Sequence, residues 1–326
     1  MKQRYGFIDY ARGIAILLVV LGHCCSTVDG CVNRTILSFH MPLFFFLSGV
    51  FAKEYTWQTA WGGIKNKILR ILIPQILLAF TIMILRVVPL LLRGSSMADF
   101  DWLYGLRYWF LPTLFLCSLL YILLSVVVNM TSPIVKFIVL LADVAAIYLT
   151  LFVFDIPNGT LVKYVKLVPV SFLFYVSGRF LNRWVLSLPK PSTGRDTVLL
   201  ILAILLFVVS QVNDHVSMYL SNYGCFPLFL LSALLGIIVV VEGCKYLQNM
   251  EILREFGEMS IAVYVWNFVV VGFTEKLTFR IIPEVAGGNG VRVAVSFVIA
   301  VMVLSFISKI TLKHLPIIYG QNKKRS

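Results

Sequence analysis

The sequence predicts an all-α, polytopic integral membrane protein. Of its 326 residues, 60% are hydrophobic and 13% are charged, whereas a soluble protein is about half apolar and about a quarter charged. Apolar runs long enough to cross a bilayer recur along the whole chain. Because the polar stretches between them are short, residues 1–326 are expected to form a single membrane domain with no separate soluble domain.

About ten of these runs are expected to cross the membrane as helices. They fall near residues 10–28, 36–52, 72–92, 108–128, 134–154, 166–182, 197–212, 224–244, 259–275 and 291–312. A helix needs about 20 predominantly apolar residues to span the hydrocarbon core. Several runs are shorter than this, so nine or eleven spans are also compatible with the sequence.

The distribution of Lys and Arg predicts the orientation. With the N-terminus inside, 18 of the 28 Lys and Arg residues fall in cytoplasmic segments and eight in outer segments, while Arg12 and Arg86 lie within spans. Lys and Arg are enriched on the cytoplasmic side of membrane proteins, so both termini are expected there. The same rule explains the formal net charge of +13, and no nucleic-acid partner is expected because no recognition fold is present.

The first span contains the most informative polar residues. Asp9 and Arg12 open it, and His23 lies near its far end in the stretch DYARGIAILLVVLGH. At about 100° per residue, the step from Arg12 to His23 returns to within about 20° of three full turns. The two side chains therefore share one helix face and lie roughly 16 Å apart along the axis. Because the hydrocarbon core is about 30 Å thick, Arg12 can lie at the membrane surface with His23 well inside.

Each of these residues also has a structural interpretation. Arg12 can snorkel to the cytoplasmic surface with Asp9 as its partner, and a single buried histidine often serves only in packing. His40, near the start of the second span, changes this balance because antiparallel spans place it at a depth similar to that of His23. Ionisable residues inside a membrane usually line a cavity or a pathway, which makes this group a candidate functional site.

Two further groups lie where predicted spans meet the membrane surfaces. Lys65, Lys67 and Arg70 precede the third span, at its inner mouth. Tyr108 and Trp109 open the fourth span at the outer interface, where an aromatic belt is the simpler explanation. The six cysteines show no metal-type spacing, and no metal is expected.

These motifs resemble the integral-membrane acyltransferase family 3. The resemblance is strongest in the first span, where Arg12 and His23 are separated by ten residues in the context IDYARGIAILLVVLGH. Similar stretches follow in order along most of the chain: FHMPLFFFLSG, RILIP, YWFLPTLFLC, FYVSGRFL and VSMYLSNYGCFPLFLLSALLGI. Within the family, the chain most resembles the fucose 4-O-acetylase-like or polysaccharide O-acetyltransferase branch. Asn267 departs from the pattern, since family members often carry a histidine in this motif of the ninth span.

The resemblance implies an O-acyltransferase that moves an acetyl or other acyl group, not an amino-acyl group, from cytoplasmic acetyl-CoA to a hydroxyl. The acceptor would be a cell-surface or lipid-linked sugar. CoA is polyanionic, so its phosphates are expected at the cations of the inner mouth: Arg12, Arg70, Lys65 and Lys67. Arginine suits phosphate because its guanidinium can form two parallel hydrogen bonds.

The same resemblance implies His23 as the general base, with a covalent acyl-histidine as the variant mechanism. Imidazole accepts and returns a proton near neutral pH. Arg12, Asp9 and His40 complete the expected catalytic group, and His40 binds the acceptor, stabilises the oxyanion or is structural. The residues expected to bind the acceptor are His40, Tyr108, Trp109 and Asn267.

Two other classes of function remain compatible with the sequence. A secondary transporter or flippase also has many spans and buried ionisable residues, but no inverted repeat or matched pair of broken helices is visible. A sensory or scaffolding membrane module is the other alternative, because relatives of this fold occur joined to a soluble racemase. In each case the expected location is the lipid bilayer of a cell membrane, most simply a bacterial cytoplasmic membrane.

Overall fold

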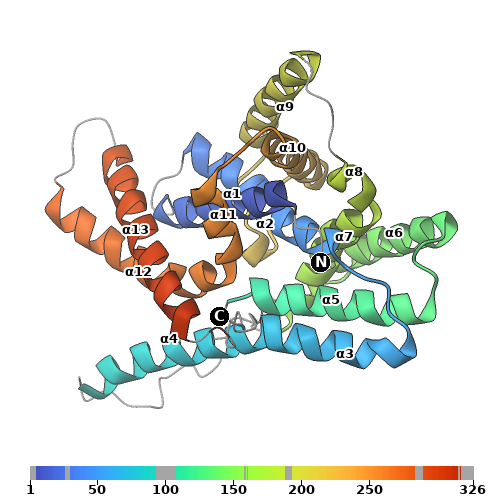
Figure 1. Cartoon of the computed structure of the whole chain (residues 1–326), viewed down its shortest axis with the longest axis horizontal. Helices are drawn as coiled ribbons and strands as arrows, with labels where there is room; N and C mark the ends of the chain where they lie inside the picture. The colour runs from blue at the N-terminus through green and yellow to red at the C-terminus, as the bar shows by residue number, and fades with distance from the viewer. Residues whose placement is uncertain are drawn as a thin grey trace. The chain divides into compact units, whose positions relative to one another are not determined.

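The computed structural model describes residues 5–25, 30–92, 108–157, 159, 161–187, 193–282, 289–314 and 316. These residues form helices joined by short connections, with one isolated β-bridge between Ser217 and Asn222 (Figure 1). The prediction of a helical, multi-pass membrane protein is therefore confirmed. The chain divides into two compact units, unit 1 (Met1–Phe51 and Gly178–Lys313) and unit 2 (Ala52–Ser177 and His314–Ser326).

Unit 1 contains the first two helices and most of the C-terminal half of the chain. Its elements are α1 (Gly6–Cys24), α2 (Cys31–Val50), α8 (Asn182–Leu186), α9 (Thr193–Val212), η5 (Met218–Leu220), α10 (Phe226–Cys244), α11 (Glu251–Glu258), α12 (Ser260–Ile281) and α13 (Gly290–His314). Unit 2 contains α3 (Trp57–Lys67), η1 (Ile68–Leu72), α4 (Ile73–Leu92), α5 (Phe110–Val127), α6 (Pro133–Tyr148), η4 (Leu149–Val153) and most of α7 (Lys163–Phe180).

Seven helical segments of the described chain are long and apolar enough to cross a membrane. They are Gly6–Cys24, Phe110–Val127, Pro133–Val153, Gly194–Val212, Phe226–Cys244, Ser260–Ile281 and Gly290–His314. The other three predicted spans coincide with α2, α4 and α7. Polar residues such as Arg34 and His40 interrupt α2, and Lys163, Lys166 and Arg179 interrupt α7. The count of ten spans and the cytoplasmic termini stay predictions.

Helix α1 is the centre of unit 1. Its sequence is an apolar run without proline, and it packs against α2, α10, α11 and α12. Ile8, Ala11, Ala15 and Val20 are buried along it. At its end, the backbone N–H of Cys25 donates to the Leu21 carbonyl and closes the last turn. These contacts fix both ends of the helix that carries Arg12 and His23.

The closest approach to α1 is made by α11, which crosses its first half in Figure 1. A Cβ atom on Gly13 would overlap the carbonyl of Leu253, and a Cβ atom on Gly257 would overlap the carbonyl of Asp9. The two helices therefore run antiparallel with their backbones in contact, as glycine permits in membrane helices. This crossing positions the turn of α1 that carries Asp9 and Arg12.

Alanine at Gly257 is expected to separate α1 from α11 and to destabilise the protein by about 1–3 kcal/mol, the usual effect of overpacking a close contact. Thermal unfolding of the purified protein in detergent measures the change. Gly272→Ala is the matched control, because a Cβ atom at Gly272 meets nothing within 4 Å. Equal melting temperatures for Gly257→Ala and Gly272→Ala would contradict the close helix crossing.

Candidate functional site

Arg12 and His23 lie on one unbroken helix, α1. Their side chains keep contact with solvent, since Arg12 is half-buried and His23 is exposed, whereas the neighbouring Ala11, Gly13 and Cys24 are buried. Both lie on the face of α1 that packs against its neighbours, because Ile16 and Val19, which lie between them on the same face, are buried. A ligand that reaches both side chains therefore has to run between α1 and the helices packed against it.

At the Arg12 end, the guanidinium lies 3.8 Å from the carboxylate of Asp9, one turn earlier on α1. It also lies over the Phe51 ring, 5.5 Å from its centroid. Asp9 is buried, and 32% of the Arg12 side chain stays exposed. The predicted Asp9–Arg12 pair is thus present, with the carboxylate buried and the cation partly exposed.

At the other end of α1, His23 and His40 lie close enough for their rings to interact electrostatically. His40 is buried, and its Nδ1 lies 2.6 Å from the Ile36 carbonyl oxygen. Because a carbonyl can only accept, Nδ1 carries the proton and Nε2 is the acceptor nitrogen of the neutral ring. The structure therefore brings His23 together with a second imidazole of fixed tautomer.

Helices α12 and α13 anchor the turn of α1 that carries His23. The Cys24 thiol interacts electrostatically with Ser296, and the Ser296 hydroxyl lies 3.2 Å from the Thr274 hydroxyl. Glu275, next to Thr274, interacts electrostatically with Cys24. Sequence reasoning did not select Glu275, although an acidic residue in a predicted apolar span was a usable signal.

Asn267 lies on α12 and is 2% exposed. Its side-chain Oδ1 has no hydrogen-bond partner within the described part of the chain. Buried polar atoms are nearly always paired in folded proteins, so this oxygen is able to accept a hydrogen bond from a ligand or a water molecule. The position is compatible with the predicted role in binding the acceptor and does not test it.

The other predicted site residues belong to unit 2. Lys65 is exposed in the last turn of α3, Lys67 ends that helix, and Arg70 is exposed in η1. Tyr108 and Trp109 immediately precede α5, and the Trp109 carbonyl accepts hydrogen bonds from Thr113. The predicted site residues that lie together in unit 1 are therefore Asp9, Arg12 and His23 on α1 and His40 on α2.

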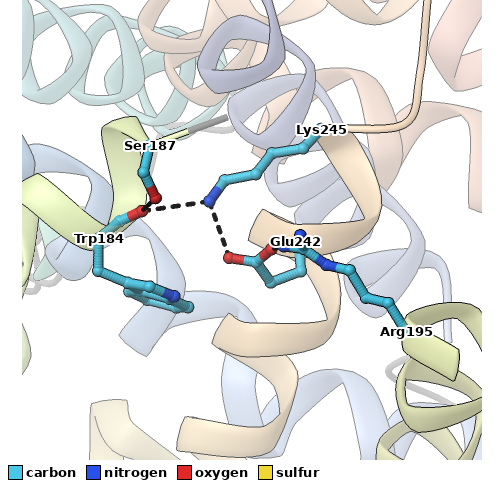
Figure 2. Close-up of polar contacts among 5 residues, drawn as sticks. All are labelled: Trp184, Ser187, Arg195, Glu242 and Lys245. Atoms are coloured by element: carbon cyan, nitrogen blue, oxygen red, sulfur yellow. Dashed lines mark hydrogen bonds and ion pairs between the residues drawn. The ribbon is translucent and has the colours of Figure 1, made fainter. Parts of the chain in front are cut away.

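A buried cluster of charges in unit 1 was missed at the sequence level. Glu242, near the end of α10, is paired with Arg195 of α9 and accepts a hydrogen bond from the Lys245 ammonium at 2.8 Å. Figure 2 shows Lys245 reaching between Glu242 and the Trp184 carbonyl, to which it donates at 3.2 Å. The signal in the sequence was an acidic residue inside an apolar run. The cluster ties α8, α9 and α10 together beside α1, where Lys245 also lies over the Phe7 ring.

The environment of Lys245, just beyond the end of α10, gives the protein a defined pH response. Burial and, to a lesser extent, the Arg195 cation lower the pKa of Lys245 from 10.5 to about 8. The ammonium form thus still predominates at neutral pH. Because the folded protein releases this proton at a lower pH than the unfolded chain, the group's contribution to the unfolding free energy increases as pH rises from about 8 towards 10.5.

Wild type is therefore expected to gain stability relative to Lys245→Met across this pH range. Chemical denaturation of the two proteins at matched pH values measures the difference between their unfolding free energies. Taking this difference removes the effect of the other titrating groups, because both proteins share them. A difference that stays constant or becomes smaller above pH 8 would contradict the assigned direction.

The fold and the site define a class: a helical, multi-pass membrane protein whose first helix carries a cation and an imidazole on one face. An acyltransferase domain model, that of acyltransferase family 3, matches residues 5–310. The chain therefore belongs to acyltransferase family 3, and it is a membrane acyltransferase. Comparison with curated proteins and with solved structures gave no match.

Proposed function

We propose that this protein is an O-acyltransferase that transfers an acetyl group from cytoplasmic acetyl-CoA to a hydroxyl of a cell-surface or lipid-linked sugar. The observation that supports this proposal most strongly is the shared face of α1, where half-buried Arg12 and exposed His23 lie along one helix. Their axial separation of roughly 16 Å is comparable to the reach of a pantetheine arm. The orientation with both termini in the cytoplasm, and hence the entry of the donor at the Arg12 end, is part of the proposal.

Arg12 binds the phosphates of the donor in this mechanism, and Asp9 holds the guanidinium in place from its other side. The Asp9 carboxylate lies 3.8 Å from Arg12 and is itself buried. A charge-assisted contact of this kind contributes about 1.5–3 kcal/mol. Lys65, Lys67 and Arg70 are further candidates for phosphate contacts and stay predictions.

His23 acts as general base. Its imidazole takes the proton of the acceptor hydroxyl as the oxygen attacks the thioester carbonyl carbon, and it returns that proton to the sulfur when the C–S bond breaks. His40 has Nδ1 engaged with the Ile36 carbonyl, so its Nε2 is suited to accepting a hydrogen bond from a sugar hydroxyl. In the proposed mechanism His40 therefore positions the acceptor and does not stabilise the oxyanion. Asn267 offers a second buried acceptor atom, Oδ1.

The proposed activity is tested in two steps. Purified protein in proteoliposomes is incubated with radiolabelled acetyl-CoA, and release of free CoA thiol is measured in the presence and absence of glycan extracted from the producing cells. Nuclear magnetic resonance of that glycan, from cells with and without the gene, then reports its O-acetyl groups. Loss of acetyl groups without the gene supports the proposal. Normal acetylation together with no thiol release would contradict the proposed donor and acceptor.

Arg12→Ala is expected to raise the KM for acetyl-CoA by about 10–100-fold, corresponding to the loss of one charge-assisted contact. The KM for the acceptor should change little, because the acceptor enters at the other end of α1. Arg280→Ala is the matched control, since Arg280 is exposed near the end of α12. A larger effect on acceptor KM than on acetyl-CoA KM would contradict the placement of the donor.

A further inference from the structure

Helix α2 buries an amide in its first turn. Asn33 is 6% exposed, although it lies only two residues after Cys31, where the helix begins. Its side-chain Oδ1 is buried and has no hydrogen-bond partner within the residues that the structure describes. Burying a polar atom without a partner costs free energy, and most such atoms are paired in folded proteins. The Asn33 amide is therefore available to hydrogen-bond with a bound molecule.

The contacts of α2 with α9 and α10 show where the Asn33 side chain does not point. Thr35 is turned towards α9, because its hydroxyl oxygen lies 2.8 Å from the Ser210 hydroxyl oxygen. Phe39 is turned towards α10, since a Cβ atom on Gly236 would overlap the Phe39 ring. At about 100° per residue, Asn33 lies about 160° from Thr35 and about 120° from Phe39 around the helix. Its side chain therefore points away from both α9 and α10.

The face of α2 that carries Asn33 meets α1 beside His23. Ile36 lies against Gly22 of α1, because a Cβ atom on Gly22 would be 3.5 Å from Ile36 Cγ2. Around α2, Asn33 is about 60° from Ile36, and His40 is about 40° from Ile36 in the same sense. His23 follows Gly22 directly on α1. Since the end of α1 meets the start of α2, the two helices are antiparallel here, and their rotations turn His23, Asn33 and His40 to one side of the helix pair.

The three side chains also lie at similar depths. Asn33 is three residues before Ile36 on α2, and His40 is four residues after it. At a rise of about 1.5 Å per residue, they lie about 4.5 Å and about 6 Å from the level of the contact with α1, on opposite sides of it. His23, one residue beyond that contact on α1, lies between these two levels. A sugar that presents one hydroxyl to His23 can therefore present a neighbouring hydroxyl to Asn33.

We propose that Asn33 binds a second hydroxyl of the acceptor sugar and thereby selects which hydroxyl reaches His23. This inference rests on the proposed transfer to a sugar hydroxyl. The Oδ1 atom accepts a hydrogen bond from the second hydroxyl, and no covalent bond is made or broken at Asn33. An acceptor without this hydroxyl leaves the buried oxygen unpaired, so the contact favours a sugar with neighbouring hydroxyl groups over a simple alcohol.

Asn33→Leu tests the proposal, because it replaces the amide by an apolar side chain of similar volume. The KM for glycan extracted from the producing cells should rise about 10-fold, the usual effect of losing one hydrogen bond. The KM for acetyl-CoA should stay unchanged, since the donor is assigned to Arg12. The melting temperature in detergent should not fall, because the Oδ1 atom that is removed has no partner in the described chain. Asn66→Leu is the matched control, since Asn66 is exposed on α3.

An unchanged acceptor KM in Asn33→Leu would overturn the proposal, whether or not the melting temperature falls. If Asn33→Leu does not accumulate as folded protein, Asn33→Ala replaces it, with the same expected change in acceptor KM. Failure of the proposed function is visible separately, as wild type that releases no CoA thiol from acetyl-CoA in the presence of glycan. Saturation-transfer difference spectroscopy with the extracted glycan then tests Asn33 without turnover: a signal lost in the variant supports the contact, and equal signals overturn it.

Discussion

Replacing His23 by alanine is expected to lower the rate of acyl transfer by about 10²–10⁴-fold, the usual contribution of a general base. The protein should fold normally, because the His23 side chain is exposed and the anchoring of α1 depends on its neighbour Cys24. The KM for acetyl-CoA should change little, since the donor phosphates are assigned to Arg12. Initial rates with labelled acetyl-CoA and extracted glycan give kcat and KM separately.

His215→Ala is the matched control for this substitution. His215 is an exposed histidine in the connection between α9 and α10, and its carbonyl accepts a hydrogen bond from Asn222. Its removal should leave the rate unchanged. Wild-type turnover in His23→Ala, at normal protein levels, would remove His23 from the chemistry and leave the family activity without the base proposed for it.

Replacing Glu242 by alanine is expected to destabilise the protein by about 3–5 kcal/mol, because it removes one partner of a buried charge cluster. Glu242 is 5% exposed, and Arg195 and Lys245 would lose their common counter-ion. The ammonium of Lys245 is especially affected, since only 1% of its side chain is exposed. Thermal unfolding and the yield of monodisperse protein after detergent extraction both report this loss.

Glu251→Ala provides the comparison for Glu242→Ala. Glu251 pairs with Arg254 on α11 and is 63% exposed, and surface pairs of this kind contribute about 0–1 kcal/mol. The activity of the Glu242→Ala protein that does fold should match that of wild type, because the cluster positions helices and is not assigned a part in the chemistry at His23. Similar stability of the two alanine variants would show that Glu242 stabilises the fold no more than the exposed Glu251 does.

The sequence was sufficient to predict the features that repeat locally along a helix. Apolar runs indicated the helices, and the spacing of Arg12 and His23 indicated that they share a face, because helical geometry depends only on separation along the chain. The boundaries were less accurate. The second span was expected at residues 36–52, whereas α2 runs from Cys31 to Val50, because polar residues at its start obscure the helix in a hydropathy pattern.

Features that depend on contacts between distant residues were not predicted. Helix α11 lies between two predicted spans, where no helix was predicted, and only its contact with Gly13 and Asp9 shows its role. The partners of Lys245 include the Trp184 carbonyl, 61 positions away.

A structure of the protein with bound acetyl-CoA, or a thioether analogue that cannot transfer its acyl group, tests the central claim most directly. The account predicts the phosphates within hydrogen-bonding distance of Arg12 and the acyl carbonyl beside the His23 imidazole. Donor density away from α1, or an acyl end remote from His23, would contradict it.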